Sequence, residues 1–296
     1  MSFKFWISFI WYQAILKLSI SREFEVVGVA VTSTFCAPDF WGVVEVFLSI
    51  KIPKITRGIT MIDKNKIFRI QDIIVYNADF LKSKFRKEII DLIITSPPYN
   101  IGIDYGKYDD NKTYQDYLKF SRQWLIKCYK LLKNNGRLCV NVPIDTGKKG
   151  KRSIAADLTI LAKQAGFKYK GTIVWDKQNS KNKHSMVFSK NLEVILTFYK
   201  NEWTPIKKEF KDWVNEIWKF SGENPKRVNH PAAYPIEVPK RLIKMLTKEK
   251  DVVFDPFSGS GTTMVASLFC NRKGIAVEID SKYYLSSSLR IKNKRG

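Results

Sequence analysis

The sequence predicts an α/β protein with a doubly wound, mostly parallel sheet. From residue 70 onward, short apolar runs typical of buried strands alternate with segments of helical period. Two of these runs end abruptly, one at a double proline and one at a glycine-rich turn that opens a helix. This alternation is typical of parallel sheets covered by helices on both faces. A hydrophobic content of 45% supports a sizeable core.

The charge composition indicates a polyanionic partner. The chain has 51 Lys and Arg against 28 Asp and Glu, a net charge of +23, of which residues 1–60 contribute six basic and four acidic side chains. Such an excess favours phosphate contacts, although lysine-rich composition in an A·T-rich genome gives the same excess. Four cysteines without C-x-x-C spacing and only two histidines predict no metal site and reduced thiols. We therefore expect a cytoplasmic location.

Residues 1–60 are expected to form an N-terminal extension. Their apolar stretch, residues 5–20, is interrupted by Gln13 and Lys17, is short for a membrane span and precedes no clear cleavage site. A membrane location is therefore not expected. Three alternatives remain: a partner-binding or membrane-associating segment, an extra element that packs on the core, or an over-extended start with Met61 as the true beginning. The pattern favours the third, which leaves residues 61–296 as one catalytic domain.

The elements can be predicted in chain order. The expected strands are Ile73–Tyr76, Asp91–Ile94, Arg137–Val142, Tyr169–Trp175, Leu192–Tyr199, Asp251–Phe254 and Gly274–Glu278. The expected helices are a short one between Asp79 and Asp91, one capped by Thr113 with Asp116 that includes Leu132, one from Ser153 to Gly166, then Pro235–Thr247, Thr262–Cys270 and a basic C-terminal helix. A polar loop from residue 100 to 112, with tyrosines nearby, and irregular basic segments at 177–190 and 200–227 complete the chain.

The first motif is Ser96-Pro97-Pro98-Tyr99, which directly follows the Asp91–Ile94 strand. Neither proline nitrogen can donate a hydrogen bond, so the strand must end there, at the edge where open α/β sheets bind ligands. The motif presents a hydroxyl, a rigid carbonyl and an aromatic face. This set suits a flat heterocycle with an exocyclic amine, while a simple strand-ending turn is the alternative.

The second motif runs from Asp255 to Thr263 and joins a strand to a helix. Its glycines, Gly259 and Gly261, allow close approach of the backbone to a ligand. Thr262 and Thr263 add hydroxyls and amides at the positive end of the helix. The spacing therefore predicts a nucleotide-type site.

An acidic residue supports this interpretation. Glu278 ends the next strand, nineteen residues after Gly259, where a Rossmann-type unit places the carboxylate that accepts ribose hydroxyls. Met264 stands where a dinucleotide site needs a third glycine, and no Gly-Lys-Thr/Ser of a P-loop follows the turn. Asp255 could hold an ammonium group, so an amino-acid-bearing nucleoside is the preferred ligand.

Together the two motifs resemble those of S-adenosylmethionine-dependent DNA amino-methyltransferases. The catalytic motif precedes the cofactor motif, as in the permuted class called beta, and the resemblance extends from about residue 66 to 290. It implies a Rossmann-like fold, S-adenosyl-L-methionine as cofactor and no metal. The implied catalytic residues are Ser96, Pro97, Pro98 and Tyr99. The implied cofactor-binding residues are Asp79, Pro231, Asp255, Phe257, Gly259, Gly261, Thr262, Thr263 and Glu278.

The resemblance further implies methyl transfer to the exocyclic amine of a base flipped out of double-stranded DNA. In this family S-P-P-Y goes mainly with cytosine N4, so Ser96 favours cytosine over the alternative, adenine N6. RNA or protein-glutamine methylation, a silent nucleic-acid-binding module and a nicotinamide oxidoreductase are weaker alternatives. Cytosine C5 chemistry is excluded because none of the four cysteines follows a proline as that family requires. A cognate restriction endonuclease is a further expected partner.

DNA contacts are expected in the basic segments. Residues 177–190 and 200–227 are the candidate target-recognition segments, since Lys, Arg, Asn and Gln read base edges. Lys148, Lys149, Lys151 and Arg152 are expected to contact the DNA backbone. His184 and His230 are expected to be structural or DNA-facing rather than catalytic.

Overall fold

The computed structural model describes residues 26–31, 46–50, 66–145, 152–178, 191–215, 217–223, 228, 230–231 and 233–293. Contacts divide the chain into two units, Met1–Gly58 and Ile59–Gly296. In the first unit β1 (Val26–Val31) pairs antiparallel with β2 (Val46–Ile50). Neither strand was predicted from the sequence, and the apolar stretch 5–20 lies outside the described residues.

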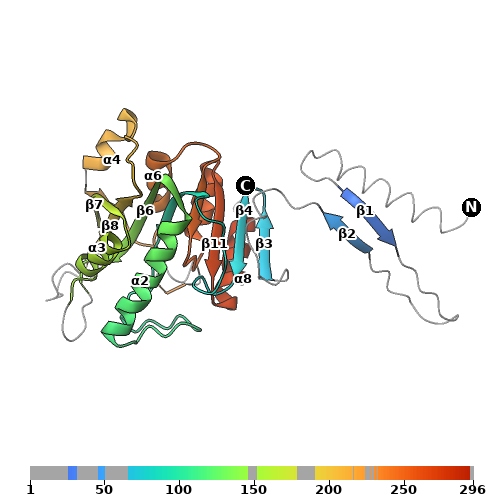
Figure 1. Ribbon diagram of the computed structural model, residues 1–296, viewed down its shortest axis with the longest axis horizontal. Helices are drawn as coiled ribbons and strands as arrows, with labels where there is room; N and C mark the ends of the chain where they lie inside the picture. The colour runs from blue at the N-terminus through green and yellow to red at the C-terminus, as the bar shows by residue number, and fades with distance from the viewer. Residues whose placement is uncertain are drawn as a thin grey trace, which may run out of the picture. The chain divides into compact units, whose positions relative to one another are not determined.

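A nine-stranded sheet forms the second unit, in the order β3-β4-β11-β10-β5-β6-β8-β7-β9 (Figure 1). Five adjacent strands of the sheet run parallel to one another: β4, β11, β10, β5 and β6. β8 runs antiparallel to both β6 and β7, and β3 runs antiparallel to β4. The predicted mostly parallel α/β sheet is therefore confirmed.

The chain builds this unit from short elements. Its strands are β3 (Ile67–Ile70), β4 (Ile73–Asn77), β5 (Ile90–Thr95), β6 (Leu132–Pro143), β7 (Lys168–Asp176), β8 (Leu192–Tyr199), β9 (Trp218–Lys219), β10 (Val252–Asp255) and β11 (Lys273–Glu278). Its helices are α2 (Tyr114–Leu131), α3 (Ile154–Gln164), the short η4 (Lys208–Phe210) and α4 (Lys211–Asn215), α6 (Glu237–Leu246), α7 (Thr262–Phe269) and α8 (Ser281–Asn293).

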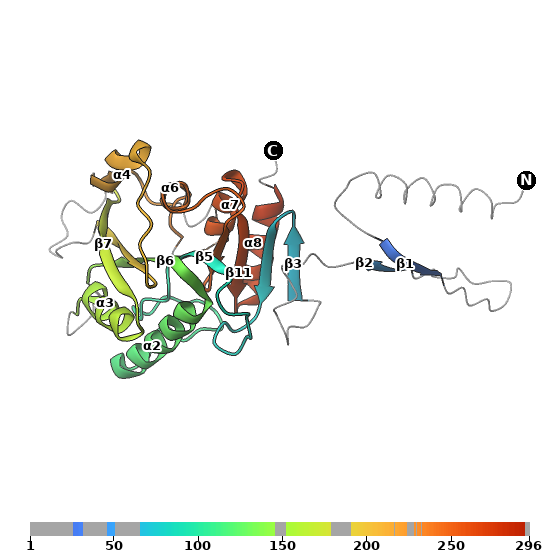
Figure 2. The same ribbon diagram turned by 45° about the horizontal axis from the view of Figure 1, so that its top comes forward.

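Helices cover both faces of the sheet. Figure 2 shows α2 and α3 on one face and α6, α7 and α8 on the other. The predicted caps are confirmed, since the Thr113 hydroxyl accepts a hydrogen bond from Asp116 N–H and the Ser153 hydroxyl accepts one from Ala156 N–H. Within the described part of the chain, no helix combines the length and the apolar character needed to cross a membrane.

The helix predicted between Asp79 and Asp91 is absent, because this segment forms turns. Lys127 Nζ on α2 donates hydrogen bonds to the carbonyl oxygens of Phe80, Leu81 and Ser83. These carbonyls are the acceptors that the first turns of a helix would use, so the tertiary contact competes with helix formation.

Two other predictions of secondary structure from the sequence were also wrong. Leu132, which was placed in the preceding helix, is extended and begins β6. The segment from 200 to 223 contains η4, α4 and β9 rather than only irregular chain.

Candidate active site

Two neighbouring strands carry the two sequence motifs to the same edge of the sheet. β5 and β10 are parallel neighbours, with Leu92 opposite Val253. Just beyond this pairing, the Thr95 hydroxyl donates a 2.9 Å hydrogen bond to Asp255 Oδ1, although the two residues are 160 positions apart. The two motifs therefore form one site at the carboxyl ends of parallel strands.

A cavity of about 250 Å³ opens at this edge. Its lining residues are Ala78, Asp79, Phe80, Leu81, Ser96, Pro98, Tyr105, Tyr108, Lys112, Phe120, His230, Pro256, Phe257, Gly259, Glu278, Ile279 and Tyr283. Six of the predicted site residues are among them: Asp79, Ser96, Pro98, Phe257, Gly259 and Glu278. The predicted residues that do not line it are Pro97, Tyr99, Pro231, Asp255, Gly261, Thr262 and Thr263.

The glycine turn faces the carboxylate of Glu278. Gly259 N–H donates a 2.7 Å hydrogen bond to Glu278 Oε2, and Asp280 N–H donates a 2.9 Å bond to Oε1. Gly259 has a φ of +49°, and a Cβ atom there would lie 2.7 Å from His230 Nε2. Glycine is therefore required both for the backbone conformation and for the close approach. Each carboxylate oxygen keeps a second lone pair for a ligand hydroxyl.

Two buried carboxyl groups near the glycine turn, those of Glu278 and Asp255, have raised pKa values. Burial raises the pKa of Glu278 to about 7, and the nearby charge of Asp255 adds to this effect, while the two amide hydrogen bonds oppose it. Burial also raises the pKa of Asp255 to about 6, against the effect of its hydrogen bonds. Such shifts are typical of functional sites.

Asp255 lies behind the cavity wall, with 2% of its surface exposed. Its Oδ1 accepts hydrogen bonds from Thr95 Oγ1 and Phe257 N–H, and its Oδ2 accepts one from Thr263 Oγ1 at 2.7 Å. The carboxylate therefore organises the turn between the two motifs. Direct contact with a ligand ammonium group stays a prediction.

The remaining residues of the turn are engaged within the protein. The Thr262 hydroxyl accepts a 2.8 Å hydrogen bond from Arg290. Gly261 is the N-cap residue that directly precedes α7 and has a φ of +75°, and a Cβ atom there would lie 3.0 Å from the Cβ of Ser287 on α8. The conformation and the tight helix packing both explain this glycine, while a ligand contact to the N-terminus of α7 stays a prediction.

The residues that directly follow β4 also line the cavity. Asp79 Oδ1 accepts a 2.8 Å hydrogen bond from Leu81 N–H. The rings of Phe80 and Phe257 pack edge to face with centroids 6.1 Å apart. A carboxylate beside aromatic and apolar side chains suits a flat heterocycle with polar edges.

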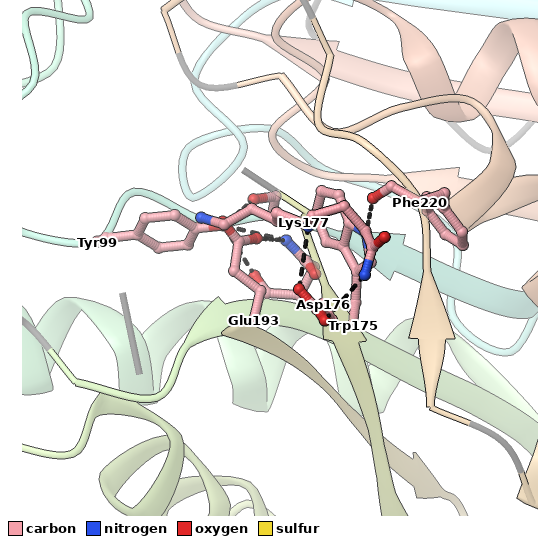
Figure 3. Close-up of polar contacts among 9 residues, drawn as sticks. Tyr99, Trp175, Asp176, Lys177, Glu193 and Phe220 are labelled. Carbon is pink, nitrogen blue, oxygen red and sulfur yellow. Dashed lines mark hydrogen bonds and ion pairs between the residues drawn. The ribbon is translucent and has the colours of Figure 1, made fainter. Parts of the chain in front are cut away.

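The catalytic motif contributes two residues directly to the cavity, Ser96 and Pro98. Tyr99 is 6% exposed, contacts the Ser96 hydroxyl with its own hydroxyl, and donates a 3.1 Å hydrogen bond to the carbonyl oxygen of Asn141. Burial, followed by the charge of Glu193, raises the pKa of Tyr99 well above its ordinary value. Figure 3 shows Tyr99 reaching toward Glu193 on β8. A stacking contact between Tyr99 and a base stays a prediction.

The loop from residue 100 to 112 contributes three lining residues that the sequence analysis did not assign: Tyr105, Tyr108 and Lys112. The loop is held by the buried carboxylate of Asp110. The sequence signal that could have identified them is the presence of aromatic residues in a polar loop directly after the catalytic motif.

His230 was expected to be structural or DNA-facing, but it lines the cavity. Its ring packs against those of Tyr283 and Tyr105, with centroids 4.6 and 5.9 Å away, and burial lowers its pKa to about 4. The imidazole is therefore neutral at physiological pH. Pro231, one of the nine predicted cofactor-binding residues, is exposed and does not line the cavity, whereas its neighbour His230 does.

The predicted DNA-binding segments are described in part. Lys177 forms a 2.9 Å ion pair with Glu193, and Lys200 is buried and donates to the carbonyl oxygen of Leu132 at 2.9 Å. These two lysines therefore have internal roles. Residues 146–151, 179–190, 216 and 224–227, which include His184 and most of the predicted backbone contacts, lie outside the described residues. Arg152 packs over the ring of Tyr114 at 4.6 Å.

The residues present fit a nucleoside-type cofactor. The space beside Gly259, which a Cβ atom would fill, lies next to the buried carboxylate of Glu278. Asp79 lines the same cavity together with its neighbour Phe80, just after the end of β4. A mostly parallel sheet with these features at its carboxyl edge, next to Ser-Pro-Pro-Tyr, defines the class of S-adenosylmethionine-dependent amino-methyltransferases.

Comparison with known proteins identifies the family. The N6/N4 methyltransferase family model, described as DNA methylase, matches residues 90–288, and the chain belongs to this family. It is 39% identical over 178 residues to the Type II methyltransferase M.MjaVI of Methanocaldococcus jannaschii, covering 54% of this chain and 92% of that protein. It is 32% identical over 232 residues to the Type II methyltransferase M.HpaI of Haemophilus parainfluenzae, covering 72% and 71%.

Solved structures share the fold. PvuII DNA methyltransferase (cytosine-N4-specific) superposes with a TM-score of 0.62 at 22% identity, over 76% of this chain and 91% of that one. The structure of TTHA0409 of Thermus thermophilus, complexed with S-adenosyl-L-methionine, gives a TM-score of 0.57 at 22% identity, over 76% of this chain and 94% of that one. The chain is thus a DNA amino-methyltransferase that uses S-adenosyl-L-methionine.

Proposed function

We propose that this enzyme methylates the N4 amine of a cytosine that is flipped out of a specific DNA site, with adenine N6 as the alternative target. The observation that carries the proposal is the position of Ser96. Its side chain lines the same cavity as Glu278 and Gly259, and its hydroxyl contacts Tyr99 of the same motif. This shared cavity supports the proposal, because an amine bound at Ser96 would lie beside the residues assigned to the cofactor.

The cofactor-binding residues are assigned by chemistry. Glu278 accepts the ribose hydroxyls, Asp79 and Phe80 hold the adenine, and the glycine turn, together with Phe257 and His230, encloses the remainder. When bound, S-adenosyl-L-methionine supplies an electrophilic methyl group on a positively charged sulfur. No metal takes part in this proposal.

The catalytic motif acts on the amine. The lone pair of an exocyclic amine is delocalised into the ring, which makes the nitrogen a poor nucleophile. Hydrogen bonds from its N–H groups to the Ser96 hydroxyl and the Pro97 carbonyl favour a more pyramidal nitrogen, whose lone pair points toward the methyl group. Stacking on Tyr99 offsets about 1–3 kcal/mol of the cost of extruding the base, and positioning provides much of the catalysis.

Two arguments favour cytosine over adenine. Ser-Pro-Pro-Tyr goes mainly with cytosine N4 in this family, and the similar PvuII enzyme is cytosine-N4-specific. Adenine N6 stays the alternative because a serine and an aspartate can accept the same hydrogen bond from an amine. The relatives M.MjaVI and M.HpaI are Type II methyltransferases, which favours a role beside a cognate restriction endonuclease.

We further propose how the chain is divided. Residues 61–296 form the catalytic domain, residues 177–190 and 200–227 contribute to target recognition, and residues 1–60 are an extension that the reaction does not need. The net charge of +23 supports a contact with the DNA backbone.

Digestion of modified DNA to nucleosides tests the proposal. Purified enzyme is incubated with genomic DNA and isotopically labelled S-adenosyl-L-methionine, and nucleosides are measured by mass spectrometry. Labelled N4-methylcytosine is expected, and sequencing of the modified DNA then gives the target site. Labelled N6-methyladenine would move the assignment to the alternative, and absence of both would refute it.

Two variants locate the chemistry. Ser96→Ala and Tyr99→Ala are expected to lower turnover by at least about 100-fold, since each removes a contact made to the reacting base. Their affinity for S-adenosyl-L-methionine, measured by calorimetry, is expected to stay within about twofold. An equal loss of turnover and cofactor affinity would show that the motif only maintains the fold.

A further inference from the structure

Three ring-bearing side chains from distant parts of the chain meet in the wall of the cavity. Tyr105 belongs to the loop that follows the catalytic motif, His230 precedes α6, and Tyr283 lies in the first turn of α8. The centroid of the His230 ring lies 4.6 Å from that of Tyr283 and 5.9 Å from that of Tyr105. All three side chains line the cavity and are partly exposed, so a ligand can contact them.

Close backbone packing holds the loop against the start of α8. Gly106 has a φ of +71°, and a Cβ atom there would lie 2.5 Å from Oδ2 of Asp280, the residue before α8. The Tyr283 hydroxyl also donates a 3.5 Å hydrogen bond to the carbonyl oxygen of Asp104. Glycine is required for the left-handed conformation and for the close approach. The fold therefore fixes Tyr105 beside Tyr283.

The three rings connect the glycine turn to the catalytic motif. His230 packs over Gly259, the turn residue beside the site assigned to the ribose. Tyr105 lies near Tyr99, whose pKa is raised by burial, then by the charge of Glu193, and further by Tyr105. In S-adenosyl-L-methionine the sulfur is bonded to the ribose and carries the methyl group that moves to the target amine. The sulfur therefore has to lie where these rings are.

The rings suit a methylated cation. The planes of His230 and Tyr283 are inclined by 62°, and those of Tyr105 and His230 by 35°. Several inclined rings attract a cation through their faces, as in aromatic cages for methylated ammonium groups. Burial lowers the pKa of His230 to about 4, so a neutral imidazole does not repel the cation. The ammonium group of Lys112, which also lines the cavity, lies over the Tyr108 ring instead, at 5.2 Å.

We infer that Tyr105, His230 and Tyr283 form an aromatic cage for the methylated sulfonium group, so that the enzyme binds S-adenosyl-L-methionine in preference to its neutral product, S-adenosyl-L-homocysteine. The inference rests on the proposed function, which assigns the ribose to Glu278 and the adenine to Asp79. Methyl transfer removes the positive charge from the sulfur, so the attraction to the rings is present before the reaction and lost after it. The cage thereby favours release of the product.

The ratio of two dissociation constants, that of S-adenosyl-L-homocysteine over that of S-adenosyl-L-methionine, tests this inference. Calorimetry measures both on the full-length protein without DNA. Tyr283→Leu keeps an apolar side chain but removes the ring, so we expect the ratio to fall about three- to tenfold relative to wild type. Contacts that the two ligands share cancel in the ratio. Tyr283→Phe keeps the ring and should keep the ratio within about twofold.

A second pair of variants makes the test independent of whether one variant folds. Tyr105→Leu should lower the ratio in the same way, and Tyr105→Phe should preserve it. Tyr108→Leu is the matched control, because Tyr108 lines the same cavity but packs its ring on Phe120, with centroids 5.2 Å apart. Tyr108→Leu should therefore keep the wild-type ratio, whatever its effect on the two separate affinities.

Three results would overturn the inference. The first is an unchanged ratio in both Tyr283→Leu and Tyr105→Leu, even if stability or both affinities fall. The second is an equal fall of the ratio in Tyr283→Phe, because the hydroxyl and not the ring would then be responsible. The third is an equal fall in Tyr108→Leu, which would attribute the effect to the cavity as a whole.

Failure of the inference is distinguishable from failure of the proposed function. If wild-type enzyme methylates no base amine, or Glu278→Gln binds S-adenosyl-L-methionine like wild type, the proposed function or its placement of the cofactor fails. If Ser96→Ala is inactive and Glu278→Gln binds the cofactor weakly, while both leucine variants keep the ratio, the active site stands and only the cage is lost.

Discussion

Asp110 Oδ1 accepts a 2.7 Å hydrogen bond from the backbone N–H of Asn100, the residue that directly follows Tyr99. Asp110 Oδ2 accepts three more, from the amides of Ile101, Gly102 and Ile103 at 3.0 to 3.1 Å. One buried carboxylate thus satisfies four consecutive backbone donors, which anchors the loop against the catalytic motif. The same loop lines the cavity beside the cofactor-binding residues.

Asp110→Ala is therefore expected to damage both stability and cofactor binding. Removing the carboxylate leaves the amides of Asn100, Ile101 and Ile103 without their acceptor, while Gly102 N–H keeps a 3.0 Å hydrogen bond to the Asp110 carbonyl oxygen. We expect the free energy of unfolding to fall by about 2–4 kcal/mol. Affinity for S-adenosyl-L-methionine should fall at the same time because Tyr105, Tyr108 and Lys112 lose their positions in the cavity wall. Urea unfolding and calorimetry measure the two effects.

Asp109→Asn is the control for that variant. Asp109 is its exposed neighbour; it forms a weak 3.8 Å ion pair with Lys112 and accepts a local hydrogen bond from the amide of Asn111. It should change stability by less than about 0.5 kcal/mol. A stability loss in Asp109→Asn equal to that in Asp110→Ala would attribute the effect to loop charge rather than to the four hydrogen bonds.

Gly259→Ala should impair the cofactor site through both backbone and sterics. Its φ of +49° disfavours a side chain, and the new Cβ would lie 2.7 Å from His230 Nε2. We expect S-adenosyl-L-methionine affinity to fall at least about tenfold, since about 1–2 kcal/mol of strain must be relieved by moving the turn. Gly171→Ala is the control because a Cβ atom there meets nothing within 4 Å. Wild-type affinity in Gly259→Ala would show that the turn is not part of the cofactor site.

The fold could be predicted because local signals agreed with the tertiary structure. The apolar strands, the Thr113 and Ser153 caps and the glycine turn before α7 each depend on residues close in sequence. The two motifs could be brought together because the carboxyl ends of parallel strands share one edge.

The errors and omissions depend on residues that are distant in sequence. In the segment from residue 80 to 89, where a helix was predicted, Lys127 binds three carbonyl oxygens from more than forty positions away, and this contact competes with helix formation. His230 lines the cavity because it packs over Gly259, and Glu193 accepts a hydrogen bond from Asn141 because β6 and β8 are neighbours. Such contacts leave no local pattern in the sequence.

A chain that begins at Met61 is expected to fold and methylate DNA like the full-length protein. Residues Ile59–Gly296 form their own contact unit, with the complete nine-stranded sheet and the whole cavity. We expect an unchanged melting temperature of the catalytic unit and turnover within about twofold. A chain that begins at Gln71 is the control, since it lacks β3, whose Phe68 and Ile70 pack on the core, and should be less stable. Loss of folding on truncation at Met61 would contradict the assignment of residues 1–60 as an extension.

The raised pKa of Glu278, about 7 against an ordinary value of 4.5, predicts opposite pH dependences for binding and stability. Only the ionised carboxylate accepts both ribose hydroxyls, so S-adenosyl-L-methionine affinity should fall as the pH drops through 7, by up to about tenfold per unit.

Without ligand, the folded state binds more protons than the unfolded state between pH 4.5 and 7. Stability should therefore decrease as the pH rises through that window, by at most about 3 kcal/mol from this group. Calorimetry and urea unfolding from pH 5 to 8 measure both trends. Glu278→Gln should abolish the component between pH 6 and 8, while any component below pH 6 from Asp255, whose pKa is about 6, stays. If the full dependence persists in Glu278→Gln, another group controls cofactor binding.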